Sequence, residues 1–454
     1  MNASLHIVIL AAGKGTRMYS KLPKVLHQIG GLPLVQHVIN TAQSLEPASI
    51  QVVIGHGKEQ VQAQIQSDVS WVVQDQQLGT GHAVKCALPN LPKDGKTLIL
   101  YGDVPLTDAE TLQQLLLQAG NEVGLLTDIL DNPQGLGRII RDEQGICAIV
   151  KEKDATPEQK AITEINTGIL VLPNSHLEKW LATLQNSNAQ GEYYLTDVIA
   201  LAVADGITVH GMTVRESHLA AGINNKLQLA EIERLYQLNQ ARALMTAGVT
   251  MRDPNRFDLR GSLSHGQDCI FDVGVVVEGT CVLGDDVQIG AHCVLNNVTI
   301  GSGCHIAPFS HLSDCVVGSD ARIGPFARLR PNAHLGNDVH IGNFVEVKNT
   351  TIGNGSKVNH LTYIGDASIG TESNIGAGSI TCNYDGVNKF KTVIGDQVRI
   401  GSGTMMVAPV NIGDKATTGA GSVITKDCPA GQLTIGRARQ VSIDKWQRPE
   451  KDSK

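Results

Sequence analysis

The chain has 454 residues, more than one hydrophobic core usually supports, so two or three domains are expected. Its net charge of −7 gives no sign of a basic surface for nucleic acid or an anionic membrane, and 42% hydrophobic with 18% charged residues is typical of a folded protein rather than a disordered one. The apolar run within residues 1–12 is too short to span a bilayer and has no charged segment before it, so we expect no signal peptide, no membrane anchor and a cytoplasmic protein.

The first predicted element is a buried strand at residues 6–10, followed by a glycine-rich loop at residues 11–18. The loop contains Lys14 and Arg17, and a flexible cationic loop suits phosphate groups. It is not a P-loop, and it is not the dinucleotide fingerprint, because Met18 stands where the third glycine belongs.

Further strands are predicted at residues 52–54, 71–73, 97–101 and 123–126, with helical stretches between them. This alternation favours a mostly parallel, doubly wound sheet, whose ligands bind at the carboxyl ends of the strands. Asp103 follows such an end. An acidic residue there is sometimes only a helix cap, but Asp108 offers a better cap, which leaves Asp103 free for a metal ion.

Residues 10–18, together with Leu22-Pro23-Lys24, resemble the signature of sugar-nucleotide pyrophosphorylases. The resemblance implies a Rossmann-like α/β nucleotidyltransferase domain over residues 1–224, with Arg17 and Lys24 as catalytic cations and Mg²⁺ on Asp103 and Asn224. It also implies that Gln74 and the loop 78–83 read the base. The residues implied to bind the nucleotide and the nucleotide sugar are Leu10, Ala11, Ala12, Gly13, Lys24, Gln74, Gly79, Thr80, Tyr101, Gly102, Asp103, Gly137, Glu152, Asn166 and Asn224. Glu152, between two lysines, could instead belong to a solvated charged run.

A linker helix is predicted over residues 225–248, where leucines recur near helical spacing and Gly248 provides a stop. The chain then enters a region rich in glycine, with 23 of the 48 glycines between residues 274 and 424.

Aliphatic residues recur six positions apart in this region, as at Leu329, Leu335 and Ile341. The period fits neither an α-helix nor one long strand. If each six-residue repeat forms one short strand and a turn, three repeats close one triangular coil of a solenoid with the aliphatic side chains inside. The period therefore predicts a parallel β-helix. The tight corners would require glycine for positive φ or for close approach of backbones.

Small side chains stand two positions before these aliphatic residues, and four of them are Cys281, Cys293, Cys304 and Cys315. We therefore expect these cysteines to be packed in the core rather than to act as ligands or nucleophiles. The nine cysteines are odd in number and form no Cys-x-x-Cys, which argues against a disulfide framework and a zinc knuckle.

Arg330 and Lys348 lie eighteen positions apart, so they should stack on adjacent coils at about 4.8 Å. Two cations so close suit a shared anion such as a sugar phosphate, although they could be two solvated surface charges. His360 follows within the next coil and is a candidate general base. Residues 381–391 interrupt the repeat as a polar loop, a common place for function.

The repeat at residues 265–424 resembles the left-handed hexapeptide β-helix of acyl- and acetyltransferases, a family that forms trimers. The His360-Leu-Thr-Tyr363 and Asn383-Tyr384-Asp385-Gly386 segments extend the likeness. With the pyrophosphorylase signature, nearly the whole chain resembles the bifunctional bacterial glucosamine-1-phosphate N-acetyltransferase and N-acetylglucosamine-1-phosphate uridylyltransferase family. The implied fold class is α/β plus β, with a left-handed parallel β-helix acetyltransferase domain at 249–437 and a C-terminal tail at 438–454.

The resemblance implies two reactions in a cytoplasmic homotrimer that binds neither nucleic acid nor membrane. His360, supported by Glu346, would deprotonate glucosamine 1-phosphate for acetylation by acetyl-CoA. The N-acetylglucosamine 1-phosphate product would then attack UTP with Mg²⁺ present and expel pyrophosphate. The residues implied to bind the sugar phosphate are Arg330, Lys348, Tyr363 and Asn374. The residues implied to bind acetyl-CoA are Ala377, Asn383, Tyr384, Ser402, Ala420 and Arg437.

Two other classes stay open from the sequence. One is a single-activity sugar-nucleotide pyrophosphorylase whose β-helix is structural or regulatory. The other is a non-catalytic scaffold, against which the intact Lys24, Asp103 and His360 argue.

Overall fold

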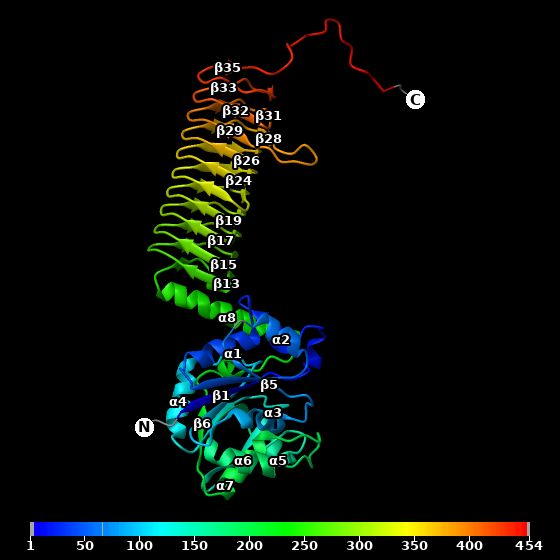
Figure 1. Ribbon diagram of the computed structural model, residues 1–454, viewed down its shortest axis with the longest axis vertical. Helices are drawn as coiled ribbons and strands as arrows, with labels where there is room; N and C mark the ends of the chain where they lie inside the picture. The colour runs from blue at the N-terminus through cyan, green and yellow to red at the C-terminus, as the bar shows by residue number, and fades with distance from the viewer. Residues whose placement is uncertain (1–3, 66, 452–454) are drawn as a thin grey trace. The chain divides into compact units, whose positions relative to one another are not determined.

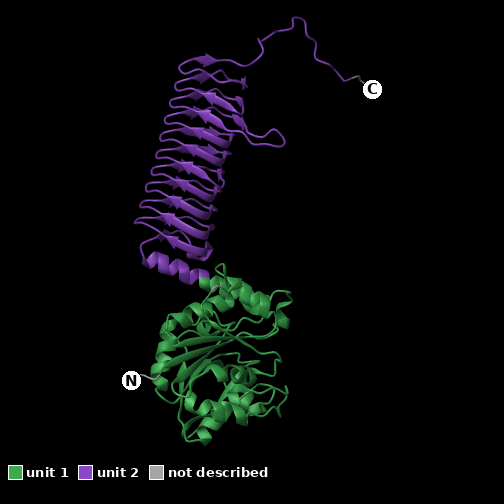
Figure 2. Cartoon of the chain, in the orientation of Figure 1, with its two compact units in different colours: residues 1–236 green, residues 237–454 purple. Residues whose placement is uncertain are grey.

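The chain forms two compact units, which meet along the sequence between Tyr236 and Gln237 (Figure 2). The computed structural model describes residues 4–65 and 67–451. The first residues of the predicted domain 1–224 and the last residues of the predicted tail 438–454 lie outside this described part. The boundary between the units falls within helix α8 (Lys226–Thr246), the helix expected over residues 225–248.

Within the described residues, unit 1 contains a nine-stranded sheet whose main path is β11-β7-β10-β6-β1-β4-β5 (Figure 1). Parallel pairing joins β1 to β4 and β6, β4 to β5, and β7 to β11, so the main path is mostly parallel, as predicted. Off this path, β8 pairs antiparallel with β9 and β10. Strand β10 was not expected; it lies antiparallel between β6 and β7. The strands are β1 (Leu5–Leu10), β4 (Ser49–Ile54), β5 (Ser70–Val73), β6 (Lys96–Tyr101), β7 (Val123–Ile129), β8 (Gly137–Asp142), β9 (Gly145–Val150), β10 (Glu164–Pro173) and β11 (Val209–Thr213).

Helices cover both faces of this sheet, because successive residues of the central strands are apolar on both sides. In β1, Val8 and Leu10 belong to one core, and Ile7 and Ile9 belong to another. The first core includes α3 (Thr80–Ala87), α6 (Asn174–Thr183) and α7 (Val198–Ala204). The second includes α1 (Leu34–Gln43), α2 (Lys58–Gln64) and α4 (Ala109–Ala119). Burial on both faces explains the continuous apolar run of this strand.

Unit 2 is a parallel β-helix, whose strands run from β12 (Thr250–Met251) to β35 (Leu433–Thr434) in two long sheets (Figure 1). Each strand pairs with the strand of the next coil, so Leu312 lies opposite Leu329, and Leu329 lies opposite Val347. These three side chains are fully buried in one continuous core. The six-residue pattern is therefore the interior of the coils, as predicted. The longer strands are β13 (Phe257–Ser264), β15 (Val275–Leu283), β17 (Val294–Ile300), β19 (His311–Val317), β24 (Glu346–Ile352) and β26 (Tyr363–Ile369).

The four cysteines expected in this core are free and buried. Burial raises the pKa of the Cys293 thiol to about 11 and that of Cys315 to about 12. The thiolate, which is the nucleophile and the metal ligand, is therefore scarce at neutral pH. The prediction of packed cysteines is confirmed.

The corner glycines chiefly allow neighbouring coils to approach. A Cβ on Gly301 would lie 2.7 Å from the Ser319 nitrogen, and one on Gly401 would lie 2.5 Å from the Ala420 nitrogen. Many left-handed corner positions are instead taken by other residues, such as Asp320 with φ 59°. Of the two reasons expected for glycine, close approach thus explains the repeated positions better.

The predicted loop leaves the β-helix between β28 (Ile380–Cys382) and β29 (Thr392–Ile394), where Figure 1 shows it projecting from the coils. Across residues 4–65 and 67–451, no helix combines the length and the apolar character needed to cross a bilayer.

Candidate active sites

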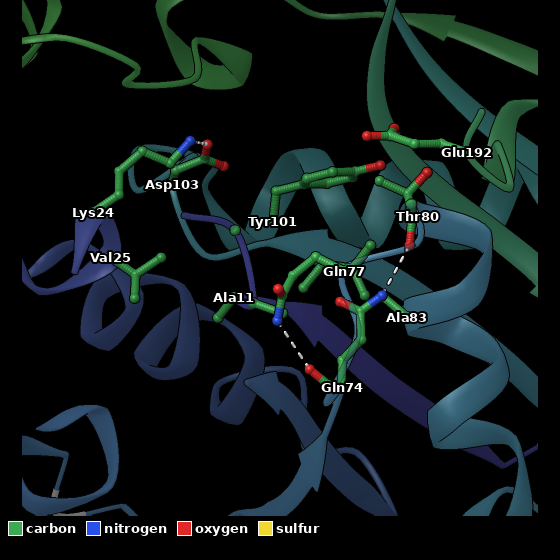
Figure 3. A pocket seen from close by; sticks show the side chains of 14 residues that line it. Ala11, Lys24, Val25, Gln74, Gln77, Thr80, Ala83, Tyr101, Asp103 and Glu192 are labelled. Atoms are coloured by element: carbon green, nitrogen blue, oxygen red, sulfur yellow. Dashed lines mark hydrogen bonds and ion pairs between the residues drawn. The ribbon is translucent and has the colours of Figure 1, made fainter. Parts of the chain in front are cut away.

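A pocket of about 280 Å³ opens where strands of the unit 1 sheet end (Figure 3). Strands β1 and β6 run parallel with Leu10 opposite Tyr101, so the loops that follow both strands reach the same edge. Strand β5 ends just before Gln74. The pocket is lined by Leu10, Ala11, Ala12, Gly13, Lys24, Val25, Gln74, Gln77, Gly79, Thr80, Ala83, Tyr101, Asp103 and Glu192.

Ten of the fifteen residues expected to bind the nucleotide line this pocket. The expected residues outside its lining are Gly102, Gly137, Glu152, Asn166 and Asn224. Sequence reasoning did not select Val25, Gln77 or Glu192 as site residues. Glu192 comes from a distant segment that is joined to the loop 78–83 only in three dimensions, through the bond from the Tyr193 nitrogen to the Leu78 oxygen (2.8 Å).

Four predicted residues converge at one side of the pocket. Lys24 forms an ion pair with Asp103, and its Nζ lies 3.1 Å from Asn224 Oδ1. Arg17 Nη2 donates to the same Asn224 oxygen at 2.9 Å. The Ile223 nitrogen donates to the Asp103 carbonyl at 2.9 Å, which holds the Asn224 segment in place. Asp108 caps α4 by accepting from the Thr111 nitrogen at 2.7 Å, so Asp103 is free of that role, as expected.

The oxygens of Asp103 and Asn224 suit a hard cation such as Mg²⁺. Both already face a positive charge, the ammonium group of Lys24. Among the described residues no group of three or more His, Cys, Asp and Glu side chains could hold a metal. A site with one carboxylate and one amide oxygen fits Mg²⁺, which commonly takes one or two protein oxygens and completes its shell with phosphate and water.

The opposite side of the pocket is formed by the loop 78–83, and Figure 3 shows Tyr101 between the two sides. Gly79 has φ 111°, and a Cβ on it would lie 2.6 Å from the Tyr193 oxygen, so this turn requires glycine. Gln74 is only 3% exposed and donates from Nε2 to the Gly79 oxygen at 3.1 Å. Burial, followed by the nearby Asp103, raises the pKa of Tyr101, which therefore stays a neutral phenol.

Gly137, Glu152 and Asn166 lie on or next to the neighbouring strands β8, β9 and β10. Gly137 pairs with Asn166 across β8 and β10. Glu152 Oε2 accepts from the Gly135 nitrogen (2.8 Å) and from Arg138 Nη2 (2.7 Å), and these bonds hold the pKa of Glu152 below its usual range. Glu152 is thus bound into the loop rather than part of a solvated run. The Asn166 strand reaches Tyr101 through Gly168, where a Cβ would lie 2.6 Å from the ring.

In unit 2, Arg330 and Lys348 follow directly paired residues on neighbouring coils, as the eighteen-residue spacing predicted. Lys389 from the 381–391 loop adds a third cation that sequence reasoning did not select. The contact and charge of Lys389, followed by burial and then the charge of Arg330, lower the pKa of Lys348, whereas the charge of Asp366 raises it. Neighbouring cations repel one another unless an anion joins them.

Glu346 contacts this cluster rather than His360. Arg330 Nη1 donates to Glu346 Oε1 at 2.7 Å, and Arg328 lies 3.8 Å from the other carboxylate oxygen. His360 Nδ1 lies 3.1 Å from Asn343 Oδ1 instead. Among the contacts of the described residues, the expected support of His360 by Glu346 does not occur. Asn343 lies seventeen residues before His360, about one coil, so the repeat spacing could have identified it as a neighbour of His360.

The other expected acetyltransferase residues lie on the following coils. Asn383 Nδ2 contacts Asp366 and lies 3.5 Å from the Tyr363 hydroxyl. Arg437 Nη1 donates to the Ala420 oxygen at 2.8 Å, and Tyr384 in the 381–391 loop is 60% exposed. Backbone bonds from the Gly403 nitrogen to the Ala377 oxygen (2.7 Å) and from the Gly421 nitrogen to the Ser402 oxygen (2.8 Å) join successive coils, and Asn374 pairs with Arg399 in the neighbouring strand.

Three family models match the chain. The MobA-like NTP transferase domain matches residues 7–130, the bacterial transferase hexapeptide (six repeats) matches 280–314, and the GMPPB C-terminal domain matches 312–415. The chain is 64% identical over 450 residues to the bifunctional protein GlmU of Neisseria meningitidis serogroup B, with 99% of both chains covered. It is 63% identical to that of Chromobacterium violaceum, again over 99% of both, and 58% identical to that of Stutzerimonas stutzeri over 99% of this chain and 100% of the relative.

Proposed function

Because the chain belongs to the family of the bifunctional protein GlmU, we infer that it is an enzyme with two activities in the synthesis of UDP-N-acetylglucosamine. Unit 2 acetylates glucosamine 1-phosphate with acetyl-CoA. Unit 1 then transfers UMP from UTP to N-acetylglucosamine 1-phosphate and releases pyrophosphate. Bifunctional relatives over the full length support this over a single-activity pyrophosphorylase with a structural β-helix.

The uridylyl-transfer site of this proposal is the unit 1 pocket, and the convergence of Lys24, Asp103 and Asn224 is the observation that carries it. Lys24 and Arg17 bind the phosphates of UTP, and Gln74 with the loop 78–83 orients the base. Glu152 and Asn166 hold the sugar, whose phosphate oxygen attacks the α-phosphorus while pyrophosphate leaves.

Asp103 and Asn224 would hold Mg²⁺, because their oxygens already converge on a cation. When bound, the ion neutralises charge on the phosphate oxygens. Lys24 must then exchange its ion pair with Asp103 for a phosphate contact. The other pocket residues keep water out and fix the angle of attack.

In the acetyl-transfer site, Arg330, Lys348 and Lys389 bind the sugar phosphate, which competes with Glu346 for the Arg330 guanidinium. His360 takes the proton from the amine as the nitrogen attacks the thioester carbonyl carbon. It returns that proton to the CoA sulfur when the carbon–sulfur bond breaks. Asn343 orients the ring of His360. Tyr363 and Asn374 fix the sugar, and a backbone N–H near Ala377 stabilises the oxyanion. Asn383, Tyr384, Ser402, Ala420 and Arg437 bind acetyl-CoA.

The proposal includes a cytoplasmic homotrimer. Hexapeptide repeats support oligomerisation, and the exposed loop around Tyr384 has room to contact a second copy of the chain. Light scattering of the purified protein would give the mass of the assembly.

An assay that omits one substrate at a time tests both activities. With glucosamine 1-phosphate and acetyl-CoA alone, we expect release of the CoA thiol; adding UTP and Mg²⁺ should then release pyrophosphate. CoA release without pyrophosphate release would leave acetyl transfer as the only activity. Pyrophosphate release from N-acetylglucosamine 1-phosphate and UTP, without CoA release in the first assay, would leave only uridylyl transfer.

A further inference from the structure

A second pocket of unit 1, of about 280 Å³, lies behind the loop 78–83. It is lined by Leu78, Gly81, His82, Lys85, Cys86, Leu181, Leu184 and Tyr193. The half-buried His82 connects this pocket to the nucleotide pocket, because its Nδ1 lies 3.0 Å from Nε2 of Gln74, which lines the nucleotide pocket. His82 thus reaches the nucleotide site through Gln74.

The hydrogen bonds of Gln74 fix which way its amide points. Its Nε2 lies 3.1 Å from the Gly79 carbonyl oxygen, which can only accept, so the amino group must be at this end. The second N–H is directed to His82 Nδ1, which must then accept it. His82 is therefore a neutral ring with its proton on Nε2, and that nitrogen lies 3.9 Å from Cys86 Sγ.

The carbonyl oxygen Oε1 is the remaining end of the Gln74 amide. Figure 3 shows the Gln74 side chain among the residues that line the nucleotide pocket. No residue within 4–65 and 67–451 donates a hydrogen bond to Oε1. The site therefore presents a hydrogen-bond acceptor on a side chain that is only 3% exposed.

A fixed acceptor distinguishes the two pyrimidines. The uracil ring of UTP has one N–H, at N3, whereas N3 of cytosine carries a lone pair. Rotation of the Gln74 amide by 180° would suit cytosine, but it would place Oε1 against the Gly79 oxygen and the lone pair of His82 Nδ1. Leaving buried polar groups facing like groups is costly, which makes such sites selective.

We propose that His82 is a positioning residue that holds the Gln74 amide with its oxygen toward the nucleotide and so contributes to the preference for UTP over CTP. The proposal rests on the proposed uridylyl transfer. His82 does not touch the substrate, and it acts together with the Gly79 carbonyl.

Three variants of the full-length chain test this. His82→Phe keeps a ring but removes the acceptor, His82→Asp restores an acceptor that cannot donate, and Cys86→Ser changes the neighbour on the other side of the ring. The measurement is kcat/KM for UTP and for CTP with N-acetylglucosamine 1-phosphate. We expect the UTP to CTP preference to fall about fivefold in His82→Phe, the effect of one hydrogen bond, and to stay within about twofold of wild type in the other two.

Equal losses with UTP and CTP in His82→Phe would indicate a merely structural role and would overturn the proposal, as would an unchanged preference. A loss of preference in His82→Asp as large as in His82→Phe would also overturn it. If the wild-type enzyme releases no pyrophosphate from UTP, the proposed uridylyl transfer itself has failed, which separates the two conclusions.

Discussion

The guanidinium of Arg330 donates to the carboxylate of Glu346 at 2.7 Å, so one of the cations expected to bind a phosphate already has an anionic partner. Both side chains are about one-third exposed, which leaves the pair accessible to a substrate. A sugar phosphate must therefore share or displace Glu346. Glu346 therefore has two candidate roles: to compete with the phosphate for Arg330, or to support His360.

Glu346→Gln distinguishes these roles. Without the carboxylate, Arg330 has no competing anion, and we expect the KM for glucosamine 1-phosphate to fall about threefold, with kcat within about twofold of wild type. Initial rates of CoA release give both parameters. A fall in kcat of about tenfold or more with unchanged KM would instead assign Glu346 to the support of His360.

His360→Ala should lower kcat for acetyl transfer by roughly 100-fold or more, because the amine loses its proton acceptor. Uridylyl transfer from supplied N-acetylglucosamine 1-phosphate should be unchanged. His305→Ala, which removes an exposed histidine from another strand of the β-helix, is the matched control and should leave both rates unchanged. Loss of both activities in His360→Ala would contradict two separate sites.

Asp103→Asn should have the opposite effect, with pyrophosphate release reduced by roughly 100-fold and acetyl transfer unchanged, since an amide replaces the charged oxygen beside Lys24. The Mg²⁺ concentration for half-maximal rate should rise as well. Asp108→Asn makes the same chemical change at the cap of α4, where asparagine caps equally well. It also removes an exposed ion pair with Arg215, which contributes little, so both activities should be nearly unchanged. A normal Mg²⁺ dependence in Asp103→Asn would rule out Asp103 as a ligand.

Periodicity was the most informative feature of the sequence. The spacing from Leu329 to Val347 equals one coil, so it predicted the pairing of these residues and the neighbouring positions of Arg330 and Lys348. The loop 11–18 and Asp103 were predictable for a similar reason, since both follow apolar strands that end at one edge of a parallel sheet.

Contacts between distant segments could not be predicted in this way. Lys389 reaches Lys348 because the loop folds back on the coils, and no repeat spacing determines that path. Glu192 enters the nucleotide pocket through bonds between Tyr193 and the loop 78–83. The antiparallel direction of β10 also has no signature, because a strand buried on both faces is apolar in either direction.

The buried thiol of Cys315 predicts a pH dependence of stability. Below about pH 9, the ordinary pKa of the thiol, it is protonated in both the folded and the unfolded chain and has no pH-dependent effect. Above that pH only the unfolded chain loses the proton, because burial raises the folded pKa to about 12, so the free energy of unfolding should fall. We expect Cys315 to account for about 2 kcal/mol of the loss between neutral pH and about pH 10.5.

Urea denaturation of wild type and Cys315→Ala at both pH values measures this effect. Alanine is already present at the equivalent inward positions Ala321 and Ala327, so the variant should fold, and its stability should depend less steeply on pH. If the free energy of unfolding depended on pH equally in the two proteins, the Cys315 thiol would not lose its proton preferentially in the unfolded chain, which would contradict this prediction.

Close approach of the coils predicts that Gly301→Ala is destabilising. The new Cβ would lie 2.7 Å from the Ser319 nitrogen and 2.8 Å from the Gly318 carbonyl carbon, and backbone atoms cannot move without shifting the next coil. We expect the free energy of unfolding to fall by about 1–3 kcal/mol, the usual cost of overpacking. Urea denaturation followed by the β-sheet circular dichroism signal measures it.

Gly355→Asn is the matched control for this prediction. Gly355 has φ 69°, a conformation that asparagine tolerates, and the nearest atom to its Cβ is Glu372 Cγ at 3.6 Å. This variant should lose less than about 1 kcal/mol, because the chain already places Asn332 in the same left-handed conformation at another corner. If Gly355→Asn were the more destabilising of the two, backbone conformation rather than contact between coils would be the reason for the repeated glycines.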